Sequence, residues 1–584
     1  MKVSLPLKDG NSFSWGMLDA AGLFQHYCRC SSAYRVFVEH ALAKHSGKWH
    51  LILYEDEVQP GNAFLGKRKV HAWYFSFREF DLHVRDENSW ICFAVLQSSI
   101  PPKVRGEFSC VSKIVAECLF TLKLPNFASG IAVELPEPYL VQVELEDLQD
   151  ADALKGKWDI KGHAGIKPCM QCNNVFMKGH SAALVHASFV DITDLDWDRV
   201  KEHQATDQEI WDAQDELLAL VGVHGMGAHR KKLETFYGQN ANADGLLACK
   251  ELRPYVKPSH SSYDPMHCYF SNGIADIQVS LLMDSLGALN FDFRAIERFV
   301  NYGWSPAETL QFSSGGVKGM ASQVLRAVPL LRHFLVKLVK PFGLLVDEIA
   351  SFELLADVVQ QLQKLKLYSK IPSSEADELR RLQALHYTAF KRAYGAEKCV
   401  PKHHYSMHIP SQLRRIGIFL DAFVCERKHR LPKEVLEYYT NAVRTVVVEL
   451  HAVTRLNLVQ LDAMSRAPTA GDLVGPSEQL EDGCIVGKTA KLQCGTTVQA
   501  GQAILAGDCC FVLSACLRDA EGLQLLMKRY NFVGFDGHPA AKIWYDSGDF
   551  VRFATDVPYM PRRFFSFLLF LKIFYFLRLS TKTD

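Results

Sequence analysis

Three acidic residues, Asp56, Asp150 and Glu426, are the strongest candidates for chemistry in this chain. The two Asp residues follow apolar runs typical of strands, and Glu426 lies beside a basic stretch. Facing carboxylates can hold two Mg²⁺ ions about 3.5–4 Å apart, one activating water or a 3′-hydroxyl and the other stabilising the leaving oxygen. Because Mg²⁺ takes few protein carboxylates besides substrate phosphates, three acids suffice. The trio predicts phosphodiester chemistry that depends on Mg²⁺ or Mn²⁺.

Each acid also has a structural interpretation. An Asp after a strand is usually a turn residue, and Glu426 among Arg and Lys side chains is compatible with a solvated ion pair of little energetic consequence. Neighbouring acids compete for two of the roles: Glu55 and Glu57 with Asp56, and Asp147 and Asp152 with Asp150.

A pair of thiols and a pair of imidazoles have the spacing of metal ligands. Cys169 and Cys172 form a CxxC after a turn-forming Gly- and Pro-containing stretch, 162–168, and His404 and His408 form an HxxxH far downstream. Together they predict a structural Cys₂His₂ zinc site that staples distant segments. His403 competes with His404. A redox-active CxxC, or separate core Cys and surface His residues, are the alternatives.

The segment 263–267 adds two further candidates, Asp264 and His267. Asp264 precedes Pro265, which is the pattern of a helix N-cap. The functional interpretation places Asp264 or His267 near the metals or the DNA.

Basic stretches at 67–69, 229–232 and 427–433 are candidates for phosphate contacts, since cationic side chains supply most of the affinity for nucleic acid. Solvated loops explain the first two equally well. The third flanks Glu426, and its DNA-binding candidates are Arg427, Lys428, Arg430 and Lys433.

The elements that must position the acids follow from hydrophobic periodicity. Strands are predicted at 49–54, 70–77, 90–96 and 139–145, with an amphipathic helix at 108–123. This order suits a ribonuclease H-like core, in which Asp56 and Asp150 leave the sheet at strand ends. Binding sites of α/β sheets concentrate at such ends.

The rest of the chain divides by composition. The predicted fold is an α/β ribonuclease H-like core with a large all-α insertion and a small β-rich C-terminal domain. Helices are expected at 207–221, 277–286, 322–339, 373–394 and 432–456. The predicted divisions are an N-terminal helical segment 1–47, core 48–160, helical insertion 161–420 with the CxxC and HxxxH, return to the core 421–465, β-rich domain 466–560 and apolar tail 561–584.

Composition bounds the class of protein. Hydrophobic residues make up 48% and charged residues 22% of the 584 residues, which is typical of a multidomain globular protein. Lys+Arg and Asp+Glu are both 65, so any attraction to DNA must come from local patches. The 16 Cys and the lack of an apolar secretory signal favour a reducing compartment. The apolar run 564–577 is shorter than the ~18–20 residues that a membrane span needs; a buried terminal helix is expected, with a membrane anchor as the minor alternative.

Six motifs in order resemble the CACTA-type (En/Spm-like) DDE transposases, and most closely the transposon-derived proteins of dinoflagellates. The similarity covers roughly residues 1–460. The motifs are YEDEVQPGN at 54–62, Asp150 before Ala153 and Leu154, KGHAGIKPCMQC at 161–172, DPMH at 264–267, HYSMH at 404–408 and ERKHR at 426–430. The family often has Gly before its second Asp, where this chain has Gln149.

The resemblance implies Asp56, Asp150 and Glu426 as Mg²⁺ (or Mn²⁺) ligands, and a structural Zn²⁺ held by Cys169, Cys172, His404 and His408. It implies metal-dependent DNA cleavage and strand transfer in the nucleus, with transposon ends and target DNA as partners. A homo-oligomer is a further expectation, and no small-molecule substrate is evident. The alternative is a catalytically inactive, transposon-derived DNA-binding or scaffold protein.

Overall fold

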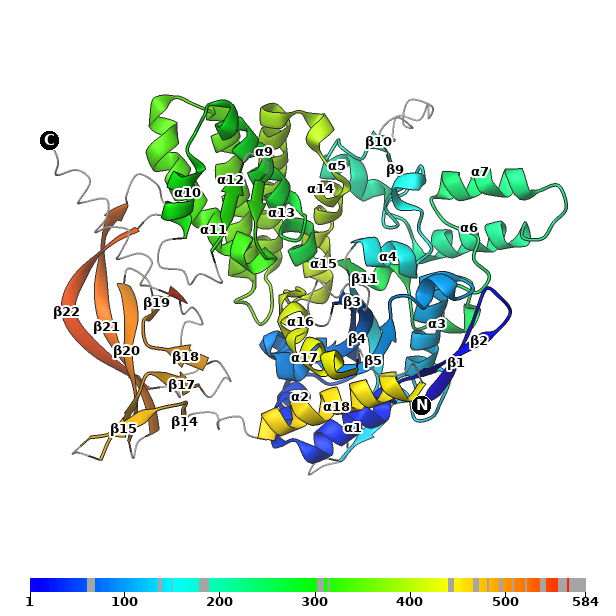
Figure 1. Cartoon of the computed structure of the whole chain (residues 1–584), viewed down its shortest axis with the longest axis horizontal. Coiled ribbons are helices and arrows are strands. Elements are labelled where there is room, and N and C mark those ends of the chain that lie inside the picture. The colour runs from blue at the N-terminus through cyan, green and yellow to red at the C-terminus, as the bar shows by residue number, and fades with distance from the viewer. Residues whose placement is uncertain are drawn as a thin grey trace. The chain divides into compact units, whose positions relative to one another are not determined.

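The structure of the chain is a computed structural model (Figure 1). It describes residues 1–59, 69–134, 139–149, 151–177, 189–301, 309–313, 316–439, 446–465, 472–480, 483–492, 497–506, 509–519, 522–535, 542–554 and 565–566.

The chain forms two compact units. The first consists of Met1–Leu282, Met320–Leu325 and Ala350–Ser465, and the second of Met283–Gly319, Arg326–Ile349 and Arg466–Asp584. All the predicted site residues belong to the first unit.

A five-stranded sheet is the centre of the first unit. Its strands are β3 (Trp49–Val58), β4 (Val70–Phe77), β5 (Ile91–Gln97), β8 (Val143–Gln149) and β11 (Ser261–Tyr263). Their order across the sheet is β11-β8-β3-β4-β5. The neighbours β3, β4 and β5 are antiparallel, whereas β8 runs parallel to β3 and β11 runs parallel to β8.

Strand register brings the ends of the three parallel strands to one edge. Tyr54 pairs with Leu148, and Gln149 pairs with Tyr263. Strands β8 and β11 end at these positions, whereas β3 continues to Val58 alongside β4, so Asp56 lies within β3, two residues beyond the end of its pairing with β8. This edge is where α/β sheets usually bind ligands.

The two faces of β3 carry different partners. Seven of the ten residues of β3 are buried, as expected of a central strand covered on both sides. Leu53 and Glu55 line one small cavity together with Phe108 and Val115 of α3 (Glu107–Phe120). Tyr54 points to the other face, because successive side chains of a strand alternate.

Helix α18 (Val446–Ser465) packs against the edge strand β5. The Asn457 side-chain amide donates to the Cys92 carbonyl at 2.8 Å, and the Tyr27 hydroxyl donates to Asn457 Oδ1 at 2.8 Å. Asn457 is buried. These bonds place the C-terminal helix of the first unit on its sheet.

The first 47 residues are mixed rather than helical. Strands β1 (Lys2–Pro6) and β2 (Ser12–Gly16) form an antiparallel hairpin before the helices α1 (Ala20–Cys30) and α2 (Ser32–Lys44). The helical segment predicted for 1–47 corresponds to α1 and α2, and the hairpin before them was not predicted.

The region predicted as an all-α insertion contributes a strand to the core sheet. Strand β11 lies within it, as do the short strands β9 (Val175–Phe176) and β10 (Val190–Asp191). Helix α4 (Ala151–Lys157) precedes this region, whose helices are α5 (Trp197–Val200), α6 (Asp207–Ala219), α7 (Gly227–Tyr237), α8 (Pro265–Tyr269), α9 (Ile274–Ala288), α10 (Phe293–Val300), α11 (Ala321–Phe334), α12 (Val346–Leu365), α13 (Ser373–Tyr394), α14 (Pro401–Ser406) and α15 (Ile409–Ile416). The predicted helix 373–394 coincides with α13.

The return to the core contains three helices. They are α16 (Phe423–Lys428), α17 (Arg430–Tyr439) and α18. The single helix predicted at 432–456 corresponds to parts of α17 and α18; residues 440–445 lie outside the described ranges.

The second unit contains α10 and all the described strands after residue 466. Strands β20 (Cys509–Asp519), β21 (Gly522–Phe535) and β22 (Lys542–Ala554) form long antiparallel ladders. A small apolar core is made by Ala490, Leu492, Val498, Leu513, Cys516, Leu523, Leu525 and Met527.

The apolar tail is almost entirely outside the described residues; only Phe565–Ser566 is placed, as the two-residue strand β23. Among the described residues, no helix has the length and apolar character that crossing a membrane requires.

Candidate functional site

Two of the predicted acids meet at the edge of the core sheet. Asp56 lies near the end of β3, Glu426 lies in α16, and His429 directly follows that helix. Ligand atoms of these three side chains all lie within 4.8 Å of one another. Segments far apart in sequence therefore present a compact group of metal-binding atoms.

Hydrogen bonds fix the Asp56 carboxylate. The Tyr54 hydroxyl donates to Asp56 Oδ2 at 3.0 Å, and the Glu57 amide donates to Asp56 Oδ1 at 2.6 Å. Each carboxylate oxygen keeps a further lone pair for another partner. The side chain is 28% exposed, so it is held by the protein yet reachable.

His429 backs the acid pair. Its Nδ1 lies 3.6 Å from Glu426 Oε2 and 4.0 Å from Asp56 Oδ2. The ring is buried, and it packs near the rings of Tyr54 and Tyr74. His429 was not among the predicted site residues, although its i,i+3 spacing from Glu426 was a signal for it.

The close approach of the two carboxyls moves their pKa values in opposite directions. Burial, then the hydrogen bond and charge of Glu426, raise the pKa of Asp56 to about 8. Burial alone would raise the pKa of Glu426, but hydrogen bonds with His429 and Asp56 lower it to about 2. Like charges in close contact separate in this way.

The raised pKa of Asp56 predicts how the affinity for a divalent metal depends on pH. A cation must displace the proton of Asp56, so affinity should rise by up to about tenfold per pH unit below pH 8 and level off above it. Glu426, with its pKa of about 2, stays ionised throughout this window. Titrating Mn²⁺ calorimetrically from pH 6 to 9 checks this; an affinity that does not change with pH contradicts it.

The raised pKa of Asp56 also determines whether the free energy of unfolding rises or falls with pH. The folded chain keeps a proton that the unfolded chain releases above about pH 4, so Asp56 lowers the free energy of unfolding as pH rises from about 4 to about 8. A bound divalent cation reverses this loss, because it replaces the proton.

Among the described residues, the acids that compete with Asp56 do not join its group with Glu426. Asp150 lies outside the described residues, just after β8. Glu55 points to the opposite face of β3 and pairs with His71, and Glu57 binds Lys69 at 2.5 Å. Among the residues competing for the first position, only Asp56 belongs to the group with Glu426.

Asp264 directly follows β11, at the same edge of the sheet. Its side chain is fully buried, and it caps α8 by accepting from the His267 amide at 3.0 Å. The N-cap interpretation of this residue is therefore confirmed. His267 also acts at a distance: its charge lowers the pKa of both Asp56 and Glu426.

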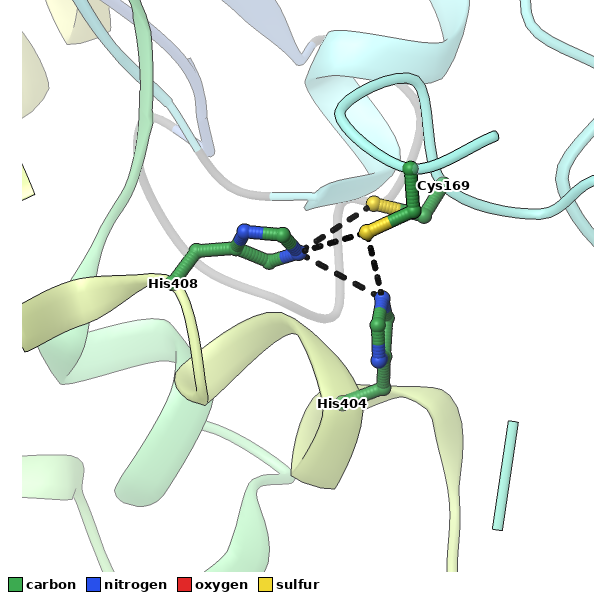
Figure 2. Close-up of side chains that lie close together, drawn as sticks. Cys169, His404 and His408 are labelled. Atoms are coloured by element: carbon green, nitrogen blue, oxygen red, sulfur yellow. Dashed lines mark hydrogen bonds between the residues drawn. The ribbon is translucent and has the colours of Figure 1, made fainter. Parts of the chain in front are cut away.

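The predicted Cys₂His₂ group comes together completely. Cys169, Cys172, His404 and His408 are all buried, and their ligand atoms lie within 4.8 Å of one another. Figure 2 shows the imidazoles of His404 and His408 turned toward the sulfur atoms of the group. Short segments from distant parts of the chain thus share one spot.

The distances between the ligand atoms fit a tetrahedral zinc ion. His408 Nε2 lies 3.5 Å from Cys169 Sγ and 3.4 Å from Cys172 Sγ, and His404 Nε2 lies 3.5 Å from Cys172 Sγ and 3.4 Å from His408 Nε2. Zn–S bonds of about 2.3 Å and Zn–N bonds of about 2.05 Å at tetrahedral angles require S···N of about 3.6 Å and N···N of about 3.4 Å. The donor set and its spacing both suit Zn²⁺.

Neighbouring residues hold the ligands in place. The Tyr405 hydroxyl donates to the Pro168 carbonyl at 3.2 Å, and Tyr263 Oη lies 3.3 Å from Cys169 Sγ. Burial alone would raise the pKa of the Cys169 thiol, but hydrogen bonding with Cys172 and the charge of His408 hold it well below its usual range. A thiolate is the form that binds metal.

The HxxxH pair spans a helix junction. His404 lies in α14, whereas His408 follows that helix and is the N-cap residue of α15. His403, the competing residue, is outside the group: the Val400 amide donates to its Nδ1 at 3.2 Å.

The basic residues beside Glu426 separate into two kinds. Lys428 is buried and donates inward to the Glu87 carbonyl and to Gln460 Oε1, both at 2.8 Å, and burial lowers its pKa to about 8. The prediction that Lys428 contacts DNA is wrong, because its ammonium is buried and donates to these two acceptors inside the protein. Arg427 is exposed but pairs with Glu87 at 3.1 Å, while Arg430 and Lys433 are exposed.

No protein-family model and no curated protein matches the chain significantly.

Proposed function

We propose that the chain is a DDE transposase-like enzyme that cleaves DNA and transfers strands with a divalent metal. The observation that carries the proposal is the meeting of Asp56 and Glu426, from distant segments, at the edge of the sheet where the parallel strands end. Such paired carboxylates are the ligand type that Mg²⁺ or Mn²⁺ uses in phosphoryl transfer.

The sheet supports the same proposal. Three antiparallel strands followed by two strands parallel to the first one, in the order β5-β4-β3-β8-β11, is the arrangement expected of a ribonuclease H-like core. Asp150, predicted as the remaining acid, follows β8, which lies between β3 and β11.

The residues of the site have distinct parts in this chemistry. Bound Mg²⁺ or Mn²⁺ would activate the attacking water or 3′-hydroxyl and neutralise charge on the leaving oxygen. Asp56 gives up its proton and offers an oxygen, while the Tyr54 hydroxyl and the Glu57 amide keep its carboxylate oriented. The buried ring of His429 lies against Glu426, with Nδ1 3.6 Å from Oε2, and limits where that side chain can go. Arg430 and Lys433 are exposed beside the site and suit phosphate contacts.

A structural Zn²⁺ at Cys169, Cys172, His404 and His408 belongs to the same proposal, as does a nuclear location. The Cys₂His₂ group joins the start of the helical region to its end, which gives a zinc ion there a stapling role.

A cleavage assay tests the activity. The purified full chain is incubated with Mg²⁺ or Mn²⁺ and with DNA taken from either side of its coding sequence, as well as supercoiled plasmid. Metal-dependent nicks that leave 3′-hydroxyl ends, followed by joined products, are the expected result. If neither metal supports nicking or joining while the chain still binds DNA, the inactive DNA-binding or scaffold protein is the better description.

A further inference from the structure

One buried carboxylate, that of Asp264, joins three parts of the first unit. Its Oδ1 accepts from the Ala422 amide at 2.9 Å, and its Oδ2 accepts from the His267 amide at 3.0 Å and contacts His267 Nδ1 at 2.5 Å. The side chain is 0% exposed. Both oxygens are thus committed to the protein.

The bond to Ala422 fixes the helix that carries Glu426. Ala422 is the N-cap residue of α16, and its carbonyl accepts from the Glu426 amide at 2.8 Å. The first amides of a helix have no partner within the helix and need one from outside. Asp264 supplies that partner from the end of β11, one helical turn before Glu426.

The bonds to His267 fix a charge near the acid pair. An imidazole that gives one ring nitrogen to a carboxylate is held in a set orientation and tautomer. His267 acts electrostatically on both Asp56 and Glu426. Asp264 therefore holds both the start of the helix that carries Glu426 and the orientation of the His267 ring.

We propose that Asp264 is a positioning residue of the acid site, holding the start of α16 and the ring of His267 from one point at the end of β11. The inference rests on the proposed function for its consequence in metal binding. Its structural part, the tether on α16, stands apart from it.

The test compares Asp264→Ala and Asp264→Asn with a matched control. Glu79 is a buried carboxylate with the same chemistry at the other end of β3: it accepts from the His50 amide at 2.8 Å and contacts His50 Nδ1 at 2.9 Å. Glu79→Ala should cost stability in a similar way without touching the acid site. Asp264→Asn keeps one acceptor oxygen and replaces the other by a donor.

Two measurements on the full chain are made: Mn²⁺ affinity by calorimetry, and hydrogen exchange of the amides from Ala422 to Glu426. Asp264→Ala should weaken Mn²⁺ binding about tenfold or more and speed exchange at Ala422. Asp264→Asn should fall between it and the wild type, and Glu79→Ala should match the wild type in both.

The outcomes separate the two proposals. Unchanged Mn²⁺ affinity and exchange in Asp264→Ala, or in Asp264→Asn where the Ala variant does not fold, overturn the positioning role while leaving the acid site standing. If the wild-type chain binds no Mn²⁺, the proposed function fails, and faster exchange at Ala422 alone still supports the tether. Equal losses in Glu79→Ala show a general effect of stability and overturn the inference.

Discussion

Replacing Cys169 by Ser is expected to remove zinc from the protein and to destabilise the first unit strongly. The wild-type chain should carry about one zinc ion, and the variant close to none. A structural zinc contributes much of the folding free energy of the segments it joins, so a loss of several kcal/mol should lower the melting temperature by on the order of 10 °C. Metal analysis and thermal unfolding measure both effects.

Cys28→Ser is the matched control for that variant. Cys28 is a fully buried thiol in α1, and burial raises its pKa to about 12, so it is a neutral core residue outside the Cys₂His₂ group. Its replacement should leave the zinc content unchanged. A wild-type protein without zinc, or a Cys169→Ser variant with wild-type zinc and stability, would show that the four side chains merely pack together.

Asp56→Asn and Glu426→Gln are each expected to lower DNA cleavage by about three orders of magnitude. Each removes one of two carboxylates on the same spot, and a metal ion supplies several kcal/mol of charge stabilisation in the transition state, of which about 4 kcal/mol corresponds to a thousandfold in rate. Cleavage rates at saturating Mn²⁺, with DNA binding measured in parallel, provide the comparison.

Glu57→Gln controls for charge and fold in this experiment. Glu57 is adjacent to Asp56 on β3, but its side chain pairs with Lys69, and such a partly exposed pair contributes little. The variant should cleave as the wild type does. If Asp56→Asn retains full cleavage, the acid pair is not the reactive centre, whatever Glu57→Gln does.

Much of the core sheet could be predicted because the local sequence of its strands has a strong preference for extended structure. The runs at 49–54, 70–77 and 90–96 are dense in aromatic and β-branched residues, and they correspond to β3, β4 and β5. Helix α13 was equally clear, since its apolar residues recur at helical spacing over 22 residues. Long periodic segments carry this information by themselves.

Strand β11 could not be predicted in the same way. It has three residues, Ser261–Tyr263, without apolar alternation, and it is a strand only because β8 offers it a hydrogen-bonding edge. The β1–β2 hairpin was missed for a related reason, since its strands are short and half exposed. Tertiary pairing, not local preference, creates these elements.

The side-chain types pointed to the Cys₂His₂ group, but spacing alone left His403 and His404 open. The choice depends on which imidazole the helix turns toward Cys172, which is a tertiary fact. Lys428 shows the opposite error: a basic residue in a basic run was expected at the surface, yet α16 turns its ammonium into the core toward Gln460. Helix orientation decides both cases.

The distance in sequence between Asp56 and Glu426 also has a meaning for how the protein is made. At typical translation rates of about 5–20 residues per second, Glu426 leaves the ribosome roughly 20 to 70 seconds after Asp56. Strands β3, β4 and β5 can pair during that interval, because they are contiguous, but α16 is synthesised only afterwards. A nascent or prematurely ended chain that stops before residue 421 therefore holds one half of the acid pair and lacks the other, so the pair forms only once nearly the whole first unit has been synthesised.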